Sequence, residues 1–189
     1  VQKYSPSGSL LFTKTEDGEF DANSEGFGIA VDSDNRIYVT GYTAAASGTT
    51  DIITIKYNQN GLLRWIETFN GQVNDEDKAF GIAVDESDNV YVTGYITRTF
   101  NTANTDAVVL KYSPSGNLRW DETYNGNGNI STDKAWGIVV DNDENGVYIT
   151  GQTATASNEL DYMTIKYTTG GIRKWVTKYN GTGNGNDVA

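Results

Sequence analysis

The chain repeats a unit of four apolar runs that are separated by short polar stretches. In the second copy of the unit, the runs cover residues 79–84, 90–95, 107–112 and 118–124. The first run is apolar at almost every position, which is typical of a strand buried on both faces. The fourth run alternates apolar and polar residues, as a half-exposed strand does. Because no segment has the periodicity of an amphipathic helix, the pattern predicts four β-strands per unit.

The units recur with a nearly constant period. Lys-Tyr pairs follow one another at steps of 53, 55 and 55 residues, and an aromatic residue of the fourth run keeps the same steps. A repeat of this length indicates an array of similar structural units and therefore decides the prediction of the fold. The Lys-Tyr pairs begin at Lys3, Lys56, Lys111 and Lys166, and the aromatic residues are Phe12, Trp65, Trp120 and Trp175.

Turn-forming residues join the third run of a unit to the fourth. These segments are Ser5-Pro6-Ser7-Gly8, Asn58-Gln59-Asn60-Gly61 and Ser113-Pro114-Ser115-Gly116. Pro ahead of Gly favours a tight reversal of the chain. Four antiparallel strands per period, ordered from most apolar to most polar, describe a β-propeller blade with its first strand near the axis. The sequence therefore predicts an all-β propeller in which the fourth-strand aromatic residues fill the space between blades.

The complete blades are predicted at 24–71, 77–126 and 133–181, with a partial blade at 1–20 and the start of another at 185–189. A closed propeller has at least about four blades, so these segments cannot close an ordinary ring. Three arrangements are open: a piece of a longer ring, half of a two-chain ring, or a head-to-tail array joined through open blade edges. Because the chain lacks an initiator Met and opens within a motif at Val1, we expect a piece of a longer protein.

Several motifs of the unit are specific enough to compare with known repeats. In the second unit they are 82–85 (Ile-Ala-Val-Asp), 89–94 (Asn-Val-Tyr-Val-Thr-Gly), Asp106 ahead of Lys111-Tyr112, 116–118 with Trp120, and 124–126. With these motifs the units resemble the SBBP family of bacterial β-propeller repeats, over nearly the whole chain. The resemblance implies a secreted or cell-surface protein, and it implies no catalytic residues.

The charge and the missing residue types exclude several functions. The net charge is −11, and the chain contains no Cys and no His. Binding to nucleic acid or to an anionic membrane depends on clustered Lys and Arg, so we expect neither. Without Cys and His there are no thiol nucleophiles, Ser-His-Asp triads or Cys-based zinc sites. No apolar stretch approaches the roughly 18 residues of a membrane-spanning helix, so we expect no membrane insertion.

Each unit carries an acidic turn between its first two strands, at 32–35, 85–89 and 141–146. Asp and Asn bond their own backbone in such turns, and this is the interpretation that we favour for all three. The third turn also begins like a calcium loop, which makes Asp141, Asp143 and Asn145 candidate calcium ligands. Its twelfth position is Gln152 instead of a bidentate Glu, so the match covers only the first half of the loop. We expect no other cofactor.

A second set of acids, Asp51, Asp106 and Asp161, recurs five residues ahead of the Lys-Tyr pairs. We interpret them as caps or turn acceptors between the second and third strands. A glycosidase pair would need two carboxyl groups about 5–10 Å apart, whereas symmetric repetition spreads equivalent acids around a ring. The unrepeated acids are Glu16, Asp17, Glu19 and Asp21, and we place them in a solvated loop.

These features favour a non-enzymatic extracellular module that serves as a scaffold, adhesion or assembly unit. Its expected partners are further copies of the chain or the rest of a longer propeller, and glycans or other proteins. Two alternatives stay open, namely an enzyme acting on polysaccharide and a ligand- or cation-binding propeller. The longest loop between the second and third strands contains Arg98 and Phe100, and it is our candidate contact surface for a ligand.

Overall fold

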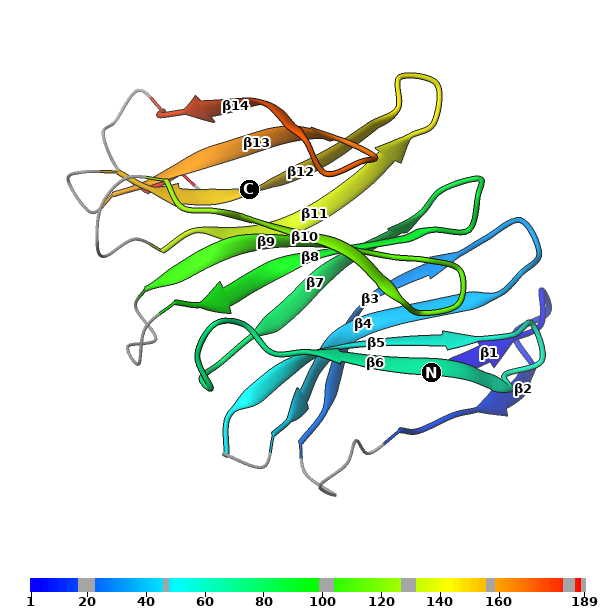
Figure 1. The fold of residues 1–189 in the computed structure, drawn as a ribbon. Coiled ribbons are helices and arrows are strands. Elements are labelled where there is room, and N and C mark those ends of the chain that lie inside the picture. Colours follow the sequence, from blue (N-terminus) through cyan, green and yellow to red (C-terminus); the bar gives the residue numbers. More distant parts are fainter. Residues whose placement is uncertain are drawn as a thin grey trace.

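A computed structural model describes residues 1–16, 23–45, 48–98, 104–126, 132–155, 159–181 and 186–187. In this part of the chain all regular structure is β-strand, arranged as three four-stranded antiparallel sheets and one two-stranded hairpin (Figure 1). The described residues thus include no helix that is long and apolar enough to cross a membrane.

The strands follow the repeat in chain order. The hairpin pairs β1 with β2, and the sheets have the orders β3-β4-β5-β6, β7-β8-β9-β10 and β11-β12-β13-β14. Each strand therefore pairs with its neighbour in sequence, as in a propeller blade. The bounds are β1 (Gln2–Tyr4), β2 (Leu10–Thr13), β3 (Glu25–Val31), β4 (Ile37–Ala44), β5 (Thr50–Tyr57), β6 (Leu63–Phe69), β7 (Lys78–Val84), β8 (Val90–Thr97), β9 (Thr105–Tyr112), β10 (Leu118–Tyr124), β11 (Lys134–Asp141), β12 (Gly146–Ala154), β13 (Leu160–Thr168) and β14 (Arg173–Tyr179).

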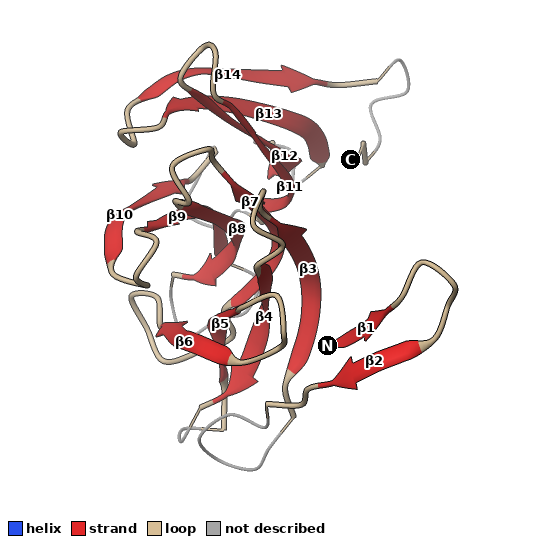
Figure 2. Ribbon diagram, turned by 90° about the vertical axis from the view of Figure 1, so that its right-hand side faces the viewer, coloured by secondary structure: helices blue, strands red, loops and turns tan. Residues whose placement is uncertain are grey.

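The sheets stack face to face, with the first strands β3, β7 and β11 next to one another (Figures 1 and 2). The prediction of all-β propeller blades is confirmed, and the sheets do not close into a ring. The hairpin covers part of the first sheet, because Val1 and Phe12 pack against a cluster that includes Ile55 and Tyr57. The hairpin strands β1 and β2 correspond to the third and fourth strands of the complete sheets.

The hydrophobic core lies between the sheets. One buried cluster joins Tyr38 and Ile52 of the first sheet to residues of the second, such as Val92 and Leu110. A second cluster joins Tyr91 and Val109 of the second sheet to residues of the third. The fourth-strand residues Trp65 and Trp120 pack against these clusters, as the sequence predicts. Stability therefore comes mainly from contacts between neighbouring blades.

Buried aspartates fix the chain where it crosses from one blade to the next. Asp77 precedes β7, and its two carboxylate oxygens accept backbone N–H groups of Gly71 at 2.5 Å and Thr97 at 2.8 Å. Asp133 accepts the N–H groups of Gly126 and Ala154 in the same way, and Asp187 accepts that of Gly181. Burial raises the pKa of Asp77 to about 6, although the two N–H donors oppose this shift.

Candidate interaction site

The acidic turns have the structural role that the sequence favours. One oxygen of the first aspartate in each turn accepts two backbone N–H groups: Asp32 those of residues 34 and 36, and Asp85 those of residues 87 and 89. Asn35, Asp88 and Asn145 adopt positive φ angles of 60°, 62° and 52°. Short polar side chains tolerate this left-handed conformation, which explains the composition of the turns.

The candidate calcium ligands Asp141, Asp143 and Asn145 lie in the third of these turns. Asp141 Oδ1 already accepts the N–H groups of residues 143 and 144, at 3.0 and 3.1 Å. Asn145 Oδ1 accepts the hydroxyl of Thr169. Gln152 is buried in β12 opposite Lys134, so it is not a ligand in this turn. Calcium binding stays a prediction; a heat of binding and a higher melting temperature in calcium would establish the site.

The structure corrects the interpretation of the second acidic set. Asp51, Asp106 and Asp161 are the second residues of β5, β9 and β13, inside the strand ladder instead of in the turns. Each has one carboxylate oxygen that is buried without a hydrogen-bond partner in the described part of the chain. Burial raises the pKa of Asp51 and of Asp106.

Parts of two other predictions fall outside the described residues. Phe100, in the predicted contact loop, lies outside the described residues. Arg98, in the same loop, is described, and its Nε lies 3.9 Å from Oδ2 of Asp106. Of the unrepeated acids, Asp17, Glu19 and Asp21 are also outside, and Glu16 accepts the Tyr57 hydroxyl.

A recurring polar contact joins each blade to the next, and we call it the clasp. Lys56 Nζ and Trp65 Nε1 both donate to the carbonyl oxygen of Pro114, at 3.0 and 3.2 Å. One blade further on, Lys111 and Trp120 donate to the carbonyl oxygen of Thr169, at 2.9 and 3.1 Å. In the hairpin, Lys3 donates to the Gln59 carbonyl at 2.8 Å, and Phe12 replaces the tryptophan. The Lys-Tyr repeat thus supplies the donors of the blade joint.

Tyrosines and the acidic turns support the clasp lysines. Lys56 Nζ lies 5.0 Å from the ring centroid of Tyr38, and the Tyr38 hydroxyl donates to Asp32. Lys111 lies 4.9 Å from the ring of Tyr91, which donates to Asp85. Cation–π attraction therefore helps to hold the lysines in place. Burial lowers the pKa of Lys56 and Lys111, as expected for ammonium groups that have left water.

A glycine in each turn makes room for the clasp aromatic residue. A Cβ atom added at Gly116 would lie 3.1 Å from the Trp65 ring, and one at Gly171 would lie 3.0 Å from the Trp120 ring. Gly61 meets Phe12 at 2.9 Å in the same manner. All three glycines have positive φ angles of 76° to 93°. The turn therefore needs glycine for its backbone conformation and for its contact with the aromatic ring.

The outer surface of the sheet β11–β14 carries the same kinds of side chain as the clasp. No blade among the described residues covers it. We call this surface the trailing face and define it by Val139, Lys166, Trp175 and Tyr179. Tyr179 is 61% exposed, whereas the equivalent Tyr124 is 7% exposed between two blades. Trp175 is 42% exposed, and Lys166 donates to the Glu144 carboxylate at 2.8 Å instead of to a turn carbonyl.

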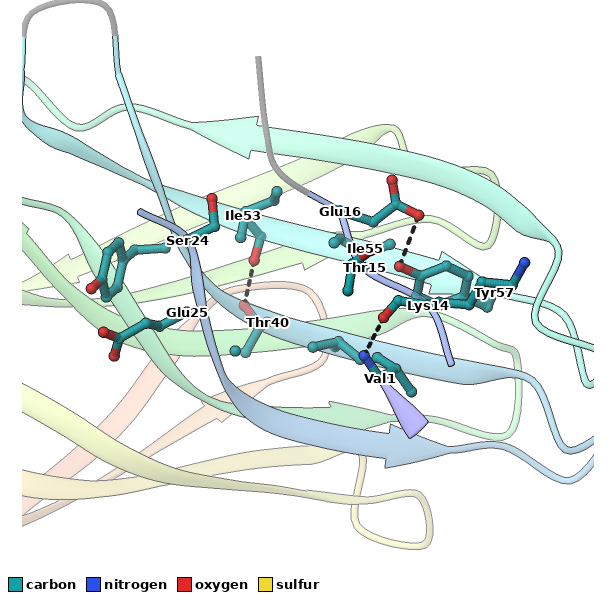
Figure 3. A pocket seen from close by; sticks show the side chains of 13 residues that line it. Val1, Lys14, Thr15, Glu16, Ser24, Glu25, Thr40, Ile53, Ile55 and Tyr57 are labelled. Carbon is teal, nitrogen blue, oxygen red and sulfur yellow. Dashed lines mark hydrogen bonds between the residues drawn. The ribbon is translucent and has the colours of Figure 1, made fainter. Parts of the chain in front are cut away.

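The opposite end of the stack is the leading face, which we define by Pro6, Gly8, Ile29 and Val31. Ile29 is 63% exposed, whereas the equivalent Ile82 is 9% exposed. Two hollows flank β1 on this side. One, of about 250 Å³, is lined by residues that include Val1, Lys14 and Glu16 (Figure 3), and the other, of about 300 Å³, is lined by residues that include Ile29 and Val31.

Sequence reasoning missed the clasp and the buried Asp77. The recurring Lys-Tyr pair was the available signal for the clasp, but its acceptor is a backbone oxygen about one blade further along the chain. The residues that supply this oxygen are Gln59, Pro114 and Thr169, which share no side-chain chemistry. An acceptor of this kind leaves no pattern in the sequence.

Comparisons with known proteins give a family-model match to two segments of the chain and two similar solved structures. The family model described as SBBP, a β-propeller repeat, matches residues 21–48 and 71–100. No curated protein matches the sequence. Two similar solved structures are a fucose lectin from Kordia zhangzhouensis in complex with methyl-fucoside and a protein of unknown function from Bacteroides caccae.

The likeness to these two structures is limited. The lectin is 11% identical, with a TM-score of 0.48, and the match covers 82% of this chain and 99% of the lectin chain. The Bacteroides protein is 10% identical, with a TM-score of 0.48, and the match covers 93% of this chain and 73% of the other. The segments matched by the family model contain β3 with β4 and β7 with most of β8, the first two strands of consecutive blades. The SBBP β-propeller repeat model therefore matches the first two strands of two consecutive blades of this chain.

Proposed function

We propose that the chain is a non-catalytic assembly module of the secreted or cell-surface type, which associates through its leading and trailing faces. The two faces are different surfaces, because one presents turns and first-strand residues and the other presents clasp donors. An interface between unlike surfaces is heterologous, so association is head to tail and produces a ring or a filament.

The observation that carries this proposal is the contrast in exposure between equivalent residues. Ile29 and Tyr179 are each more than half exposed, whereas Ile82 and Tyr124 are buried by neighbouring blades. Exposed apolar surface of this kind marks an interaction site when it is contiguous. The contacts that bury Ile82 and Tyr124 therefore indicate what would cover Ile29 and Tyr179.

The chemistry of the acids supports a non-catalytic role. The carboxylate oxygens of Asp77 and Asp133 are bonded to backbone N–H groups that hold the blades together. The extracellular location rests on the family resemblance.

Light scattering coupled to size-exclusion chromatography tests the proposal. We expect a mass above the 20.6 kDa of one chain that increases with protein concentration. A mass of one chain from nanomolar to submillimolar concentration would show that the faces do not associate, and the proposal would be wrong.

Glycan binding is a second candidate, supported by a row of aromatic rings on the first strands. The ring centroids of Phe27 and Phe80 are 5.2 Å apart, and those of Phe80 and Trp136 are 4.5 Å apart. Aromatic faces of this kind line many ligand sites. A glycan array with Trp136→Ala as the control tests this candidate, and a uniformly blank array would remove it.

A further inference from the structure

We propose that Lys166 and Trp175 form a binding site for the turn Ser5–Gly8 of a second copy of this chain. The inference rests on the proposed function and specifies its interface. The ligand of this site is a tight peptide turn. One carbonyl oxygen of the turn accepts hydrogen bonds from the lysine and the indole N–H, and the glycine of the turn packs against the indole ring.

The same contact is already formed between two blades of one chain. Lys56 and Trp65 hold the turn 113–116, whose sequence is Ser-Pro-Ser-Gly. The turn 5–8 has the same four residues in the same order. Its backbone is also the same, because Gly8 N donates to Ser5 O at 2.9 Å and Gly116 N donates to Ser113 O at 3.0 Å.

The turn Ser5–Gly8 is accessible on the leading face. Gly8 is exposed and has a φ angle of 82°, and a Cβ atom added there would meet no atom within 4 Å. The equivalent glycines Gly61, Gly116 and Gly171 are buried against aromatic rings. The space that an indole ring occupies at Gly116 is therefore open at Gly8.

The trailing face supplies the matching donors. Lys166 Nζ lies 4.8 Å from the ring of Tyr148, as Lys56 and Lys111 lie on their tyrosines. The ring centroids of Tyr148 and Trp175 are 6.0 Å apart, close to the 6.1 Å between Tyr91 and Trp120. Both donors of the last blade thus have the arrangement of a formed clasp. Glu144, on the exposed turn ahead of β12, accepts from Lys166 in place of a carbonyl.

The two surfaces belong to different copies in this contact. The hairpin β1–β2 and the strand β14 lie at opposite ends of the stack of sheets (Figures 1 and 2). One copy therefore cannot bring its own turn to its own Trp175 without unstacking its blades. A second copy in head-to-tail orientation can place its turn Ser5–Gly8 against Trp175. In this orientation the blades of the second copy continue the stack of the first.

Two blocking variants and two matched controls test the site. Trp175→Ala removes the indole, and Gly8→Asn places a side chain where the indole would lie. Asn tolerates the left-handed backbone, so the second variant should fold. The control Gly48→Asn makes the same substitution at another open glycine, with a φ angle of 80°. The control Ile172→Ala removes an exposed apolar side chain next to the turn of the same blade.

Sedimentation equilibrium measures the association constant of each variant. We expect Trp175→Ala and Gly8→Asn each to weaken association by about tenfold or more, as loss of a central interface residue does. The controls should stay within about twofold of the unmodified chain. Trp175→Phe should retain part of the affinity, because Phe12 packs on Gly61 without an indole N–H.

Mixing the two blocked variants separates this inference from the proposed function. Each variant should be monomeric alone, and an equimolar mixture should form a heterodimer but no larger species, because one intact site remains. If both blocked variants associate like the unmodified chain, the clasp is overturned while the assembly function stands. If the unmodified chain does not associate at any concentration, both are overturned.

Discussion

At the scale of single residues, the repeat is constrained by close backbone contacts. Register shifts interrupt β3, β7 and β11, and the carbonyl of the residue just ahead of each shift lies against a glycine of the neighbouring strand. These glycines are Gly41, Gly94 and Gly151. At Gly94 a Cβ atom would overlap the carbonyl oxygen of Lys78. The sequence predicted a strand here but gave no reason for the glycine, because the bulge forms on the neighbouring strand.

Gly94→Ala should therefore destabilise the protein by about 3 kcal/mol or more, because the added methyl group has no space. Urea unfolding measures the change. Gly170→Ala is the control, since a Cβ atom added there would meet Thr168 Oγ1 only at 3.7 Å. It should change the free energy of unfolding by less than about 0.5 kcal/mol. Equal effects of the two substitutions would contradict the explanation.

Asp77 makes stability depend on pH. Its pKa is about 6 in the folded state, against a reference value of 3.8. Between these values the folded state binds more protons than the unfolded state, so the free energy of unfolding falls as the pH rises through this range. The melting temperature should therefore be higher at about pH 5 than at about pH 7.

Asp77→Asn is the matched variant for this dependence. It removes the titrating group, so the change in melting temperature between the two pH values should become smaller, whatever the variant costs in stability. Asp51 and Asp106 shift in the same direction as Asp77 and should leave some dependence behind. An unchanged dependence in Asp77→Asn would exclude Asp77 as its source.

At the scale of elements, the strands followed closely from the apolar pattern. The runs predicted at 79–84, 90–95, 107–112 and 118–124 correspond to β7, β8, β9 and β10, at 78–84, 90–97, 105–112 and 118–124. The largest differences are at the ends of β8 and β9, where polar residues such as Thr97 and Thr105 continue the ladder. Backbone pairing extends a strand beyond its apolar part, and a hydropathy pattern does not report it.

The clasp predicts different costs for the same substitution in two blades. Trp120 is half-buried, rests on Gly171 and donates to Thr169, so Trp120→Ala should cost about 2–4 kcal/mol. Trp175→Ala should cost less than about 1 kcal/mol, because no blade covers Trp175 among the described residues. Denaturant unfolding at low protein concentration measures both, and equal costs would show that the clasp contributes little.

At the scale of the whole molecule, the described part of the chain forms a stack of blades in which the main contacts between sheets join neighbouring blades. The two buried clusters lie between sheets, and the outer faces of the stack keep exposed apolar residues. Stability in such arrays is a sum of blade and interface terms, so a further interface adds to it. The proposed association would therefore add to the stability of the chain.

The melting temperature should increase with protein concentration, because association favours the folded state by mass action. In Trp175→Ala this increase should be lost, whereas Ile172→Ala should keep it. Calorimetry over a range of concentrations measures the effect. An increase of the same size in Trp175→Ala would place the association at another surface.

The sequence by itself determined the strands, the period and the blade, because these depend on the local alternation of apolar and polar residues. It also identified the aromatic residues that pack between blades. Only the tertiary structure decided which atoms join the blades. The acceptors of Lys56 and Trp65 and the donors to Asp77 are backbone groups, which every residue carries, so their roles depend on spatial position alone. For the same reason, equivalent residues such as Tyr124 and Tyr179 differ only in whether a blade covers them.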